Sequence, residues 1–369
     1  MALRLFSRKK EVRKRPGRGW RKSALATAYE PAAAQRYSDH PLERLVQLGR
    51  YGILAADPNQ WKEQPGFSST YERVLEAIDD SFGYVPEGYA SIPQTIQDAP
   101  GCAEQDFDTN PYLLARHCVT HAEYQSFVDD DGYENLDLWP EDIWPHLIDF
   151  KDLTACAGPR YWKDGRHDKR YERHPVVGIS FYEAGAFARW AGYRLPSEAE
   201  WQMAASWRIR SSAQTIRRYP WGDALNIRHC NVWASSIGQT LPVDECASGA
   251  APNGVMQLVG NVWEWTACDF TACDSEGRNV VGDMVLKAIR GGAFDTYFPA
   301  QATSVFRTGS VGLARVHNIG FRCALDLPSD DEDGEQPPVG GADRVDSPSA
   351  PMRDDPVRTP ELAGLPDAN

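Results

Sequence analysis

The sequence reads NGVMQLVGNVWEWT from Asn253 to Thr266 and RGGAFDTYFPAQATSVFRTGSVGLARVHNIGFRC from Arg290 to Cys323. The first stretch gathers Gly, Asn, Glu and two Trp into a short run. The second has the pattern of a strand, a long irregular loop and a second strand. These two stretches decide the fold and carry the strongest functional signal in the chain.

The 369-residue chain is 42% hydrophobic and contains 12 Trp, 15 Tyr and 13 Phe, which is enough for one good-sized core. Its formal net charge is −13, yet residues 4–22 form a basic run. Such a run suits contact with nucleic acid or an anionic surface, and its composition is also that of a disordered segment. No apolar segment fits a signal sequence or a membrane span, so the sequence predicts a cytoplasmic protein without a transmembrane segment.

Composition divides the chain into four parts. Residues 1–36 are expected to form a disordered basic leader. Residues 328–369 are expected to form a disordered, acidic, Pro-rich tail, because they contain too few apolar residues to offset the entropy lost on folding. Apolar residues at helical spacing over 42–54 and 70–80 predict a helical prelude at 37–81. The remaining residues, 82–327, form the main domain.

The main domain has short predicted strands and well-marked helix starts. We expect strands at 112–117 and 176–179. Three helices are expected to start after a Ser or Thr that is followed three residues later by Glu, the pattern of a capping box, at Thr120, Ser180 and Ser197. Residues 134–173, rich in Trp, Pro and charged side chains, predict a long loop layer over the core.

Several sequence motifs of the main domain resemble those of a known family. They are HPVVGISFYEAGAFARWAGYRLPSEAEWQMAAS at 174–206, YPWGD at 219–223, CNVW at 230–233 and the two stretches quoted above. On these words residues 82–327 resemble the formylglycine-generating enzyme family, also called sulfatase-modifying-factor domains. The resemblance implies an α+β, C-type-lectin-like fold that is loop-rich and has few regular elements.

This family includes copper-dependent oxidases, iron-dependent sulfoxide synthases, accessory proteins and non-catalytic binding modules, so the fold alone does not choose a function. The resemblance implies that formylglycine generation uses two Cys, five residues apart after RGG, to hold Cu(I). Those positions are Thr296 and Gln301 here, and neither supplies a thiolate. Formylglycine generation is therefore not expected.

Two other sets of residues have metal-binding spacing. Cys268 and Cys273 are five apart, but they precede RGG, and we interpret them as ordinary thiols in a chain whose eight Cys show no zinc-finger spacing. His117, His121 and Glu123 resemble the H-x3-H-x-E iron motif of the sulfoxide synthases. In those enzymes the motif belongs to a separate helical domain, whereas here it spans a strand and a helix start. Copper or iron at either set is an alternative that we do not favour.

The resemblance also implies structural calcium around GNVWEW, where oxygen ligands suit a hard cation. The implied ligands of a first site are Gln257, the carbonyls of Gly260 and Val262, and Glu264. Those of a second site are Asn231 and the Val232 carbonyl. The alternative is an unmetalled turn in which Glu264 hydrogen-bonds to the backbone.

The loop at 295–317 mixes aromatic and small polar residues, as recognition surfaces do. The candidate surface consists of Asp295, Thr296, Tyr297, Phe298, Gln301, Thr303, Arg307, Arg315 and His317. Our first hypothesis is a non-catalytic module that binds a protein or peptide partner through this loop. The alternative for the aromatic pair, Tyr297 and Phe298, is that both pack inward. Two other functions stay open: a metal-dependent oxidase or oxygenase using copper or non-haem iron, and a retroelement-diversified receptor of the same fold.

Overall fold

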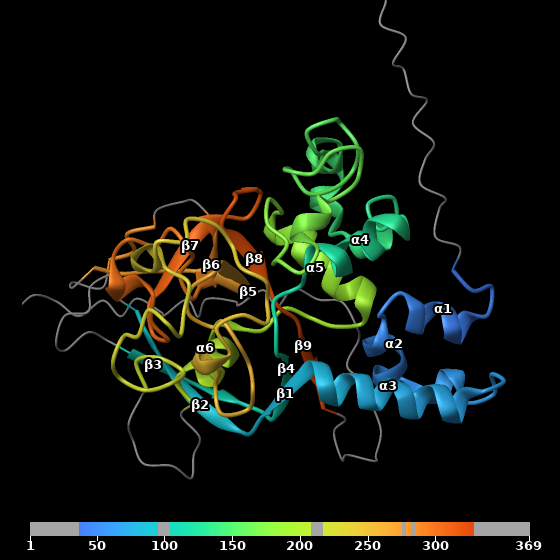
Figure 1. The fold of residues 1–369 in the computed structure, drawn as a ribbon, viewed down its shortest axis with the longest axis horizontal. Helices are drawn as coiled ribbons and strands as arrows, with labels where there is room; N and C mark the ends of the chain where they lie inside the picture. Colours follow the sequence, from blue (N-terminus) through green and yellow to red (C-terminus); the bar gives the residue numbers. More distant parts are fainter. Residues whose placement is uncertain (1–36, 95–103, 208–216, 275–277, 282–284, 328–369) are drawn as a thin grey trace, which may run out of the picture. The chain divides into compact units, whose positions relative to one another are not determined.

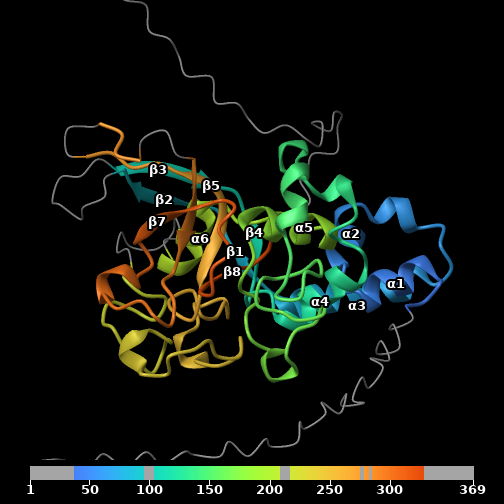
Figure 2. The same cartoon turned by 90° about the horizontal axis from the view of Figure 1, so that it is seen from above.

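The computed structural model describes residues 37–94, 104–207, 217–274, 278–281 and 285–327 (Figures 1 and 2). The predicted leader at 1–36 and the predicted tail at 328–369 lie outside these residues. All described residues belong to one compact unit. None of the described helices is long and apolar enough to cross a membrane.

A four-stranded sheet contains both of the decisive stretches. In spatial order its strands are β7 (Arg307–Val311), β6 (Leu286–Arg290), β5 (Trp263–Phe270) and β8 (Ile319–Phe321). β5 pairs antiparallel with β6 and parallel with β8, so Glu264 lies opposite both Arg290 and Gly320. The expected long loop after Arg290 is present, but β7 interrupts it.

Two smaller antiparallel sheets complete the strands. One contains β1 (Phe82–Val85), β4 (Tyr112–Ala115) and β9 (Ala324–Asp326), and the other contains β2 (Gly88–Pro93) and β3 (Glu104–Thr109). The strand predicted at 112–117 ends earlier than expected, at Ala115. Beyond this end the Arg116 amide donates to the carbonyl of Ser81, the residue before β1.

Six α-helices are described: α1 (Pro41–Gln47), α2 (Tyr51–Ala56), α3 (Phe67–Ser81), α4 (His121–Asp129), α5 (Phe181–Ala191) and α6 (Glu198–Ser206). All three predicted capping boxes are confirmed, at the starts of α4, α5 and α6. In the box of α5, the Ser180 hydroxyl accepts from the Glu183 amide at 3.2 Å, and the Glu183 carboxylate accepts from the Ser180 amide at 2.8 Å. Local side-chain chemistry therefore sets these helix starts.

The prelude differs from prediction in one respect. The single helix expected over 42–54 is two helices, α1 and α2, because Gly49 adopts a left-handed φ of 72° between them. α2 lies so close to the end of α5 that a Cβ on Gly52 would come within 2.3 Å of the Gly192 carbonyl oxygen. Figures 1 and 2 both place α1–α3 at the opposite end of the described region from β7.

The largest buried cluster lies between the four-stranded sheet and helices α4 and α5. Trp265 of β5 and Phe321 of β8 are fully buried there, against aromatic side chains of both helices. Tyr124 of α4 stacks on Phe187 of α5 with ring centroids 5.4 Å apart. Aromatic packing of this kind fixes the sheet relative to the helices.

The prediction of a strand at 176–179 is wrong. Val176 and Ile179 are buried as expected, but Gly178 adopts a left-handed φ of 75°, which an extended strand does not allow. The segment is held instead by separate bonds, from the Val176 amide to the Val119 carbonyl and from the Gly178 amide to the Val316 carbonyl. An apolar run marked burial correctly but did not establish strand pairing.

The predicted loop layer at 134–173 is confirmed: it contains no strand and no α-helix, and its helical segments are 3-10 turns, of which the longest spans nine residues. Across the described chain the 3-10 turns are η1 (Pro58–Trp61), η2 (Leu136–Leu138), η3 (Glu141–Asp149), η4 (Lys169–Tyr171), η5 (Trp233–Ser235), η6 (Ala247–Gly249) and η7 (Pro299–Gln301). With its three sheets, six helices and many loops, the described part of the chain has the α+β, loop-rich architecture expected from the sequence.

Candidate functional site

A buried ion pair joins the two decisive stretches. Arg322 donates from Nε to one carboxylate oxygen of Glu264 at 2.6 Å and from Nη2 to the other at 2.7 Å. The indole of Trp201 donates to the same carboxylate at 2.8 Å, and all three side chains are fully buried. Burial lowers the pKa of Arg322 and the Glu264 carboxylate raises it, with a net upward shift that keeps the guanidinium charged.

This ion pair bears on the first implied calcium site. Both oxygens of Glu264 already accept charge-assisted hydrogen bonds, so its carboxylate does not fit a cation ligand in this arrangement. Gln257 is also engaged, because its carbonyl oxygen accepts from the Asn261 amide at 2.7 Å. The Gly260 carbonyl accepts from the Val262 amide.

The second implied calcium site fits a cation better. The side-chain carbonyl oxygen of Asn231 is buried and has no hydrogen-bond partner among the described residues. A buried, unpartnered oxygen is costly unless a donor or a cation satisfies it. The Val232 carbonyl beside it accepts from the Ser235 amide at 2.8 Å. Calcium stays a prediction, and Asn231 is the residue on which it depends.

The position that would need a copper-binding Cys is built into a turn. The hydroxyl of Thr296 accepts from the Ala293 amide at 2.8 Å, and its carbonyl accepts from the Trp233 amide. Gln301 ends the short turn η7. Thr296 therefore has a structural role immediately after RGG.

The other candidate metal ligands have separate partners. The sulfur of Cys268 accepts from the Glu198 amide, and burial raises the pKa of this thiol; Cys273 lies beyond the end of β5. His117 contacts the sulfur of Met256, His121 accepts from Trp162, and Glu123 caps α4. In the part of the chain that the structure describes, no three His, Cys, Asp or Glu residues are grouped to hold a metal ion.

Four residues of the predicted binding surface are internal: Thr296, described above, and Thr303, Arg307 and Arg315. Arg307 forms a two-point ion pair with Glu198 at 2.8 and 2.9 Å. Arg315 is buried in an ion pair with Glu183 at 2.9 Å and donates to the Lys151 carbonyl. Thr303 is buried and accepts from the Phe306 amide. These side chains stabilise the loop from within and do not form part of its exposed surface.

Other residues of the predicted surface point outward. The exposed fractions are 65% for Tyr297 and 60% for Phe298, and Trp233 from a separate turn is 56% exposed. Tyr297 meets Trp233 edge to face at 6.0 Å between centroids and Phe298 at 5.2 Å. We call these three residues the aromatic surface. Trp233 was not predicted to belong to this surface, because its place in the CNVW motif gives no sign that the side chain is exposed.

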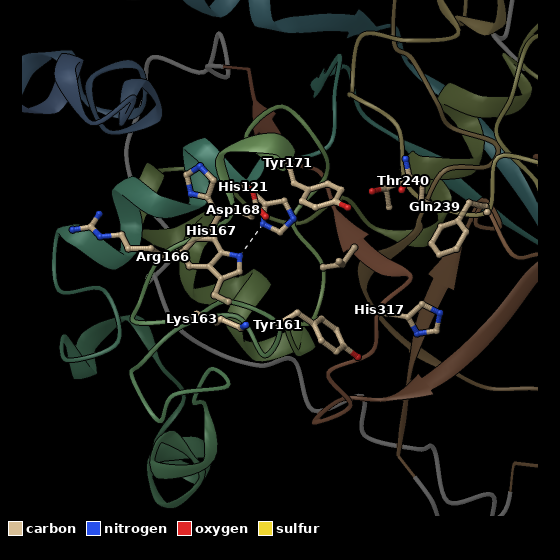
Figure 3. Close-up of a pocket in the computed structure, with 14 residues that line it drawn as sticks. His121, Tyr161, Lys163, Arg166, His167, Asp168, Tyr171, Gln239, Thr240 and His317 are labelled. Carbon is tan, nitrogen blue, oxygen red and sulfur yellow. Dashed lines mark hydrogen bonds between the residues drawn. The ribbon is translucent and has the colours of Figure 1, made fainter. Parts of the chain in front are cut away.

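Beside this loop lies a cavity of about 650 Å³ (Figure 3). The loop contributes His317 to its wall, and Phe294 lies immediately before the loop. The opposite wall comes from residues 161–171, and residues 238–240 complete it. At the loop side, the Asp295 carboxylate accepts from the Asn318 amide at 3.0 Å and lies 3.2 Å from Nε2 of His317.

Residues 161–171 belong to the segment that was predicted only as a loop layer over the core. The signal was present in YWKDGRHDKRY, where three aromatic residues lie within a short, strongly charged segment. The residues on the opposite wall, Phe294 and His317, are more than 120 positions away in the sequence, so only tertiary packing brings the two walls together. Of the predicted iron-motif residues, only His121 lines the cavity.

Comparison with known proteins gives one family match. The model of the sulfatase-modifying factor enzyme 1-like domain matches residues 79–327. The match therefore includes the four-stranded sheet, the aromatic surface and the cavity.

Curated relatives of this chain carry different activities in their names. A hercynine oxygenase of Mycobacterium tuberculosis is 35% identical over 170 residues, which cover 43% of this chain and 38% of that protein. A formylglycine-generating enzyme of Streptomyces coelicolor is 29% identical over 289 residues, which cover 68% of this chain and 86% of that protein. An inactive C-alpha-formylglycine-generating enzyme 2 of Bos taurus is 31% identical over 251 residues, covering 60% and 79%. The match to the first of these spans well under half of that relative's length.

Proposed function

The chain belongs to the sulfatase-modifying factor enzyme 1-like family, and from this premise we propose that it is a non-catalytic module that binds a protein or peptide partner through the loop at 295–317. Relatives of this chain include proteins named as enzymes and a protein named as inactive, so membership alone leaves both functions open. The loop is held by the α+β, loop-rich fold described above.

The observation that carries the proposal is the aromatic surface. Three large rings, Trp233, Tyr297 and Phe298, are each more than half exposed, and Tyr297 contacts both of the others. Exposed aromatic side chains that form one patch are typical of binding sites, since burying them on association releases ordered water and gains dispersion contacts. A single exposed ring would not carry this argument.

The loop beneath the aromatic surface is held in place before any partner arrives. Thr296, next to Tyr297, bonds to Ala293 and Trp233, and Arg315 is buried in its ion pair with Glu183. A loop that is already ordered loses little conformational entropy on binding. The partner chemistry that fits three clustered rings is an apolar or aromatic peptide segment.

The lack of thiolates argues against formylglycine chemistry at this loop. Thr296 and Gln301 occupy the two positions where the resemblance implies copper-binding Cys. The sulfur of Cys268 accepts a hydrogen bond from the Glu198 amide, and the raised pKa of this thiol keeps it protonated near neutral pH. A metal-dependent oxidase therefore needs a site other than these residues.

A displayed peptide library tests the proposal directly. Peptides selected on the full-length chain are compared for affinity on the Tyr297→Ser/Phe298→Ser double variant and on Tyr84→Ser, a control with 52% exposure on β1. We expect the double variant to lose about tenfold or more in affinity, roughly 1.4 kcal/mol, and the control to lose none. Equal affinity for wild type and double variant overturns the proposal. So does stoichiometric copper or iron together with oxygen consumption.

A further inference from the structure

We propose that the cavity between residues 161–171 and His317 binds a small organic monoanion that carries a planar ring, such as an aromatic carboxylate. This site goes beyond partner binding at the aromatic surface, because none of Trp233, Tyr297 and Phe298 lines the cavity. The volume of about 650 Å³ lies within the range of small-molecule sites, which is roughly 300–1,000 Å³.

The walls suit a planar ring. Four aromatic side chains line the cavity, namely Tyr161, Trp162, Tyr171 and Phe294. Trp162 is buried and fixed by its indole hydrogen bond, whereas Tyr161 is 43% exposed at the opening. Fixed aromatic faces bind flat rings by stacking and edge-to-face contact, and they do so without reordering.

The net charge of the walls suits a single negative charge. Arg166 is neutralised by Asp129 at 2.7 Å, and Asp168 by Arg170 at 2.6 Å. Lys163 forms no ion pair with any other residue that the structure describes, and it is exposed at the cavity. One uncompensated cation favours a monoanion over a phosphate with two charges.

A buried donor supplies the second polar contact. The Trp162 indole donates to Nδ1 of His121 at 2.8 Å, so this nitrogen is an acceptor. Burial lowers the pKa of His121 to about 3, which keeps the imidazole neutral at physiological pH. Its proton must then be on Nε2. Among the described residues Nε2 has no hydrogen-bond partner, although the side chain is only 8% exposed and lines the cavity.

The polar and apolar parts of the site are arranged for one ligand orientation. Figure 3 draws His121 and Lys163 on one side of the cavity and His317 on the other. A carboxylate at the first side accepts from His121 Nε2 and pairs with Lys163. The ring then extends toward Phe294, which meets His317 edge to face at 5.9 Å between centroids. The carboxylate thus lies on the side away from Asp295, the partner of His317 and Asn318.

Matched ligand pairs test this inference. Indole-3-acetate and benzoate are compared with indole-3-acetamide and benzamide, using ligand-detected NMR and tryptophan fluorescence on the full-length chain. Each pair has the same ring and differs in charge, so the comparison isolates the anion. We expect the acids to bind about tenfold or more tightly than the amides. No binding by either acid, or equal binding of acid and amide, overturns the inference.

Side-chain variants place the anion. Lys163→Met should weaken acid binding about tenfold, while Lys62→Met, an exposed lysine outside the cavity, should leave it unchanged. An unchanged affinity in Lys163→Met overturns the inference. The Tyr297→Ser/Phe298→Ser variant should bind the acids as wild type does, so failure of the cavity proposal and failure of the partner-binding proposal are distinguishable.

Discussion

Trp233 and Tyr297 meet edge to face with ring centroids 6.0 Å apart, yet each ring is more than half exposed. Their segments are also tied by a hydrogen bond from the Trp233 amide to the Thr296 carbonyl. The backbone contact holds the segments together, so the rings are not needed for that purpose. Because the rings are exposed and are not needed to join the two segments, we assign them to the proposed partner surface.

The first prediction separates binding from stability at the aromatic surface. The Tyr297→Ser/Phe298→Ser variant should change the free energy of unfolding by less than about 0.5 kcal/mol per residue, because exposed side chains contribute little to folding. Urea denaturation measures this. A loss of several kcal/mol would mean that the rings pack in the folded state and would remove the reason to assign them to a partner.

The second prediction concerns the buried pair of Arg322 and Glu264. Arg322→Met should lower the free energy of unfolding by about 3–5 kcal/mol, because Glu264 is left as an unpaired buried charge. Glu264→Gln added to Arg322→Met should recover part of the loss. Breaking the more exposed pair of Arg166 and Asp129 with Arg166→Met should cost about 1 kcal/mol or less. Equal losses from the two Arg variants would contradict the structural role of Arg322.

The third prediction is a pH dependence from His121. Its folded-state pKa is lowered to about 3 from 6.5, so between these pH values the unfolded chain binds a proton that the folded chain does not. Stability should therefore fall as pH falls through this window, with this residue contributing up to about 1.4 kcal/mol per pH unit. In the His121→Asn variant the Asn carbonyl oxygen can accept the hydrogen bond from Trp162 but does not titrate. The slope of its free energy of unfolding against pH should therefore be smaller by up to that amount. Parallel profiles for wild type and variant would contradict a neutral, buried His121.

The fourth prediction tests calcium at Asn231, whose side-chain oxygen is buried without a described partner. Calcium should raise the unfolding temperature of the wild type, and a chelator should reverse the rise; saturation at 100 times Kd corresponds to about 2.7 kcal/mol. Asn231→Asp should bind calcium more tightly, since it adds a charge to the site. No shift with calcium in either protein would exclude a site at this residue.

Much of the framework could be predicted because its signals are local. The boxes at Ser180 and Glu183, and at Ser197 and Glu200, act within three residues, and each sets a helix start that the structure contains. The apolar run at Val176–Ile179 reported burial but not pairing, since Gly178 needs a backbone angle that a hydrophobic pattern does not reveal. Patterns of short range thus specify helices better than strands here.

The candidate site was predicted only in part, because its contacts are distant in sequence. Glu183 was identified as a capping residue, but its ion pair with Arg315 joins positions 132 residues apart. The same holds for the cavity, where Trp162 and His121 face Phe294 and His317. The mixture of aromatic and small polar residues indicated a recognition loop, while the exposure of Tyr297 and the burial of Thr303 could be learned only from the fold.

The most direct test of the account replaces Tyr297 with a photo-crosslinking amino acid in the full-length chain within its native cells. The same replacement at Tyr84, 52% exposed on β1, is the control. Mass spectrometry identifies the adducts. We expect a discrete protein adduct from position 297 that is absent from position 84 and is lost when Trp233→Ser is added. The same adducts at both positions, or none at position 297, would contradict a partner surface on this loop.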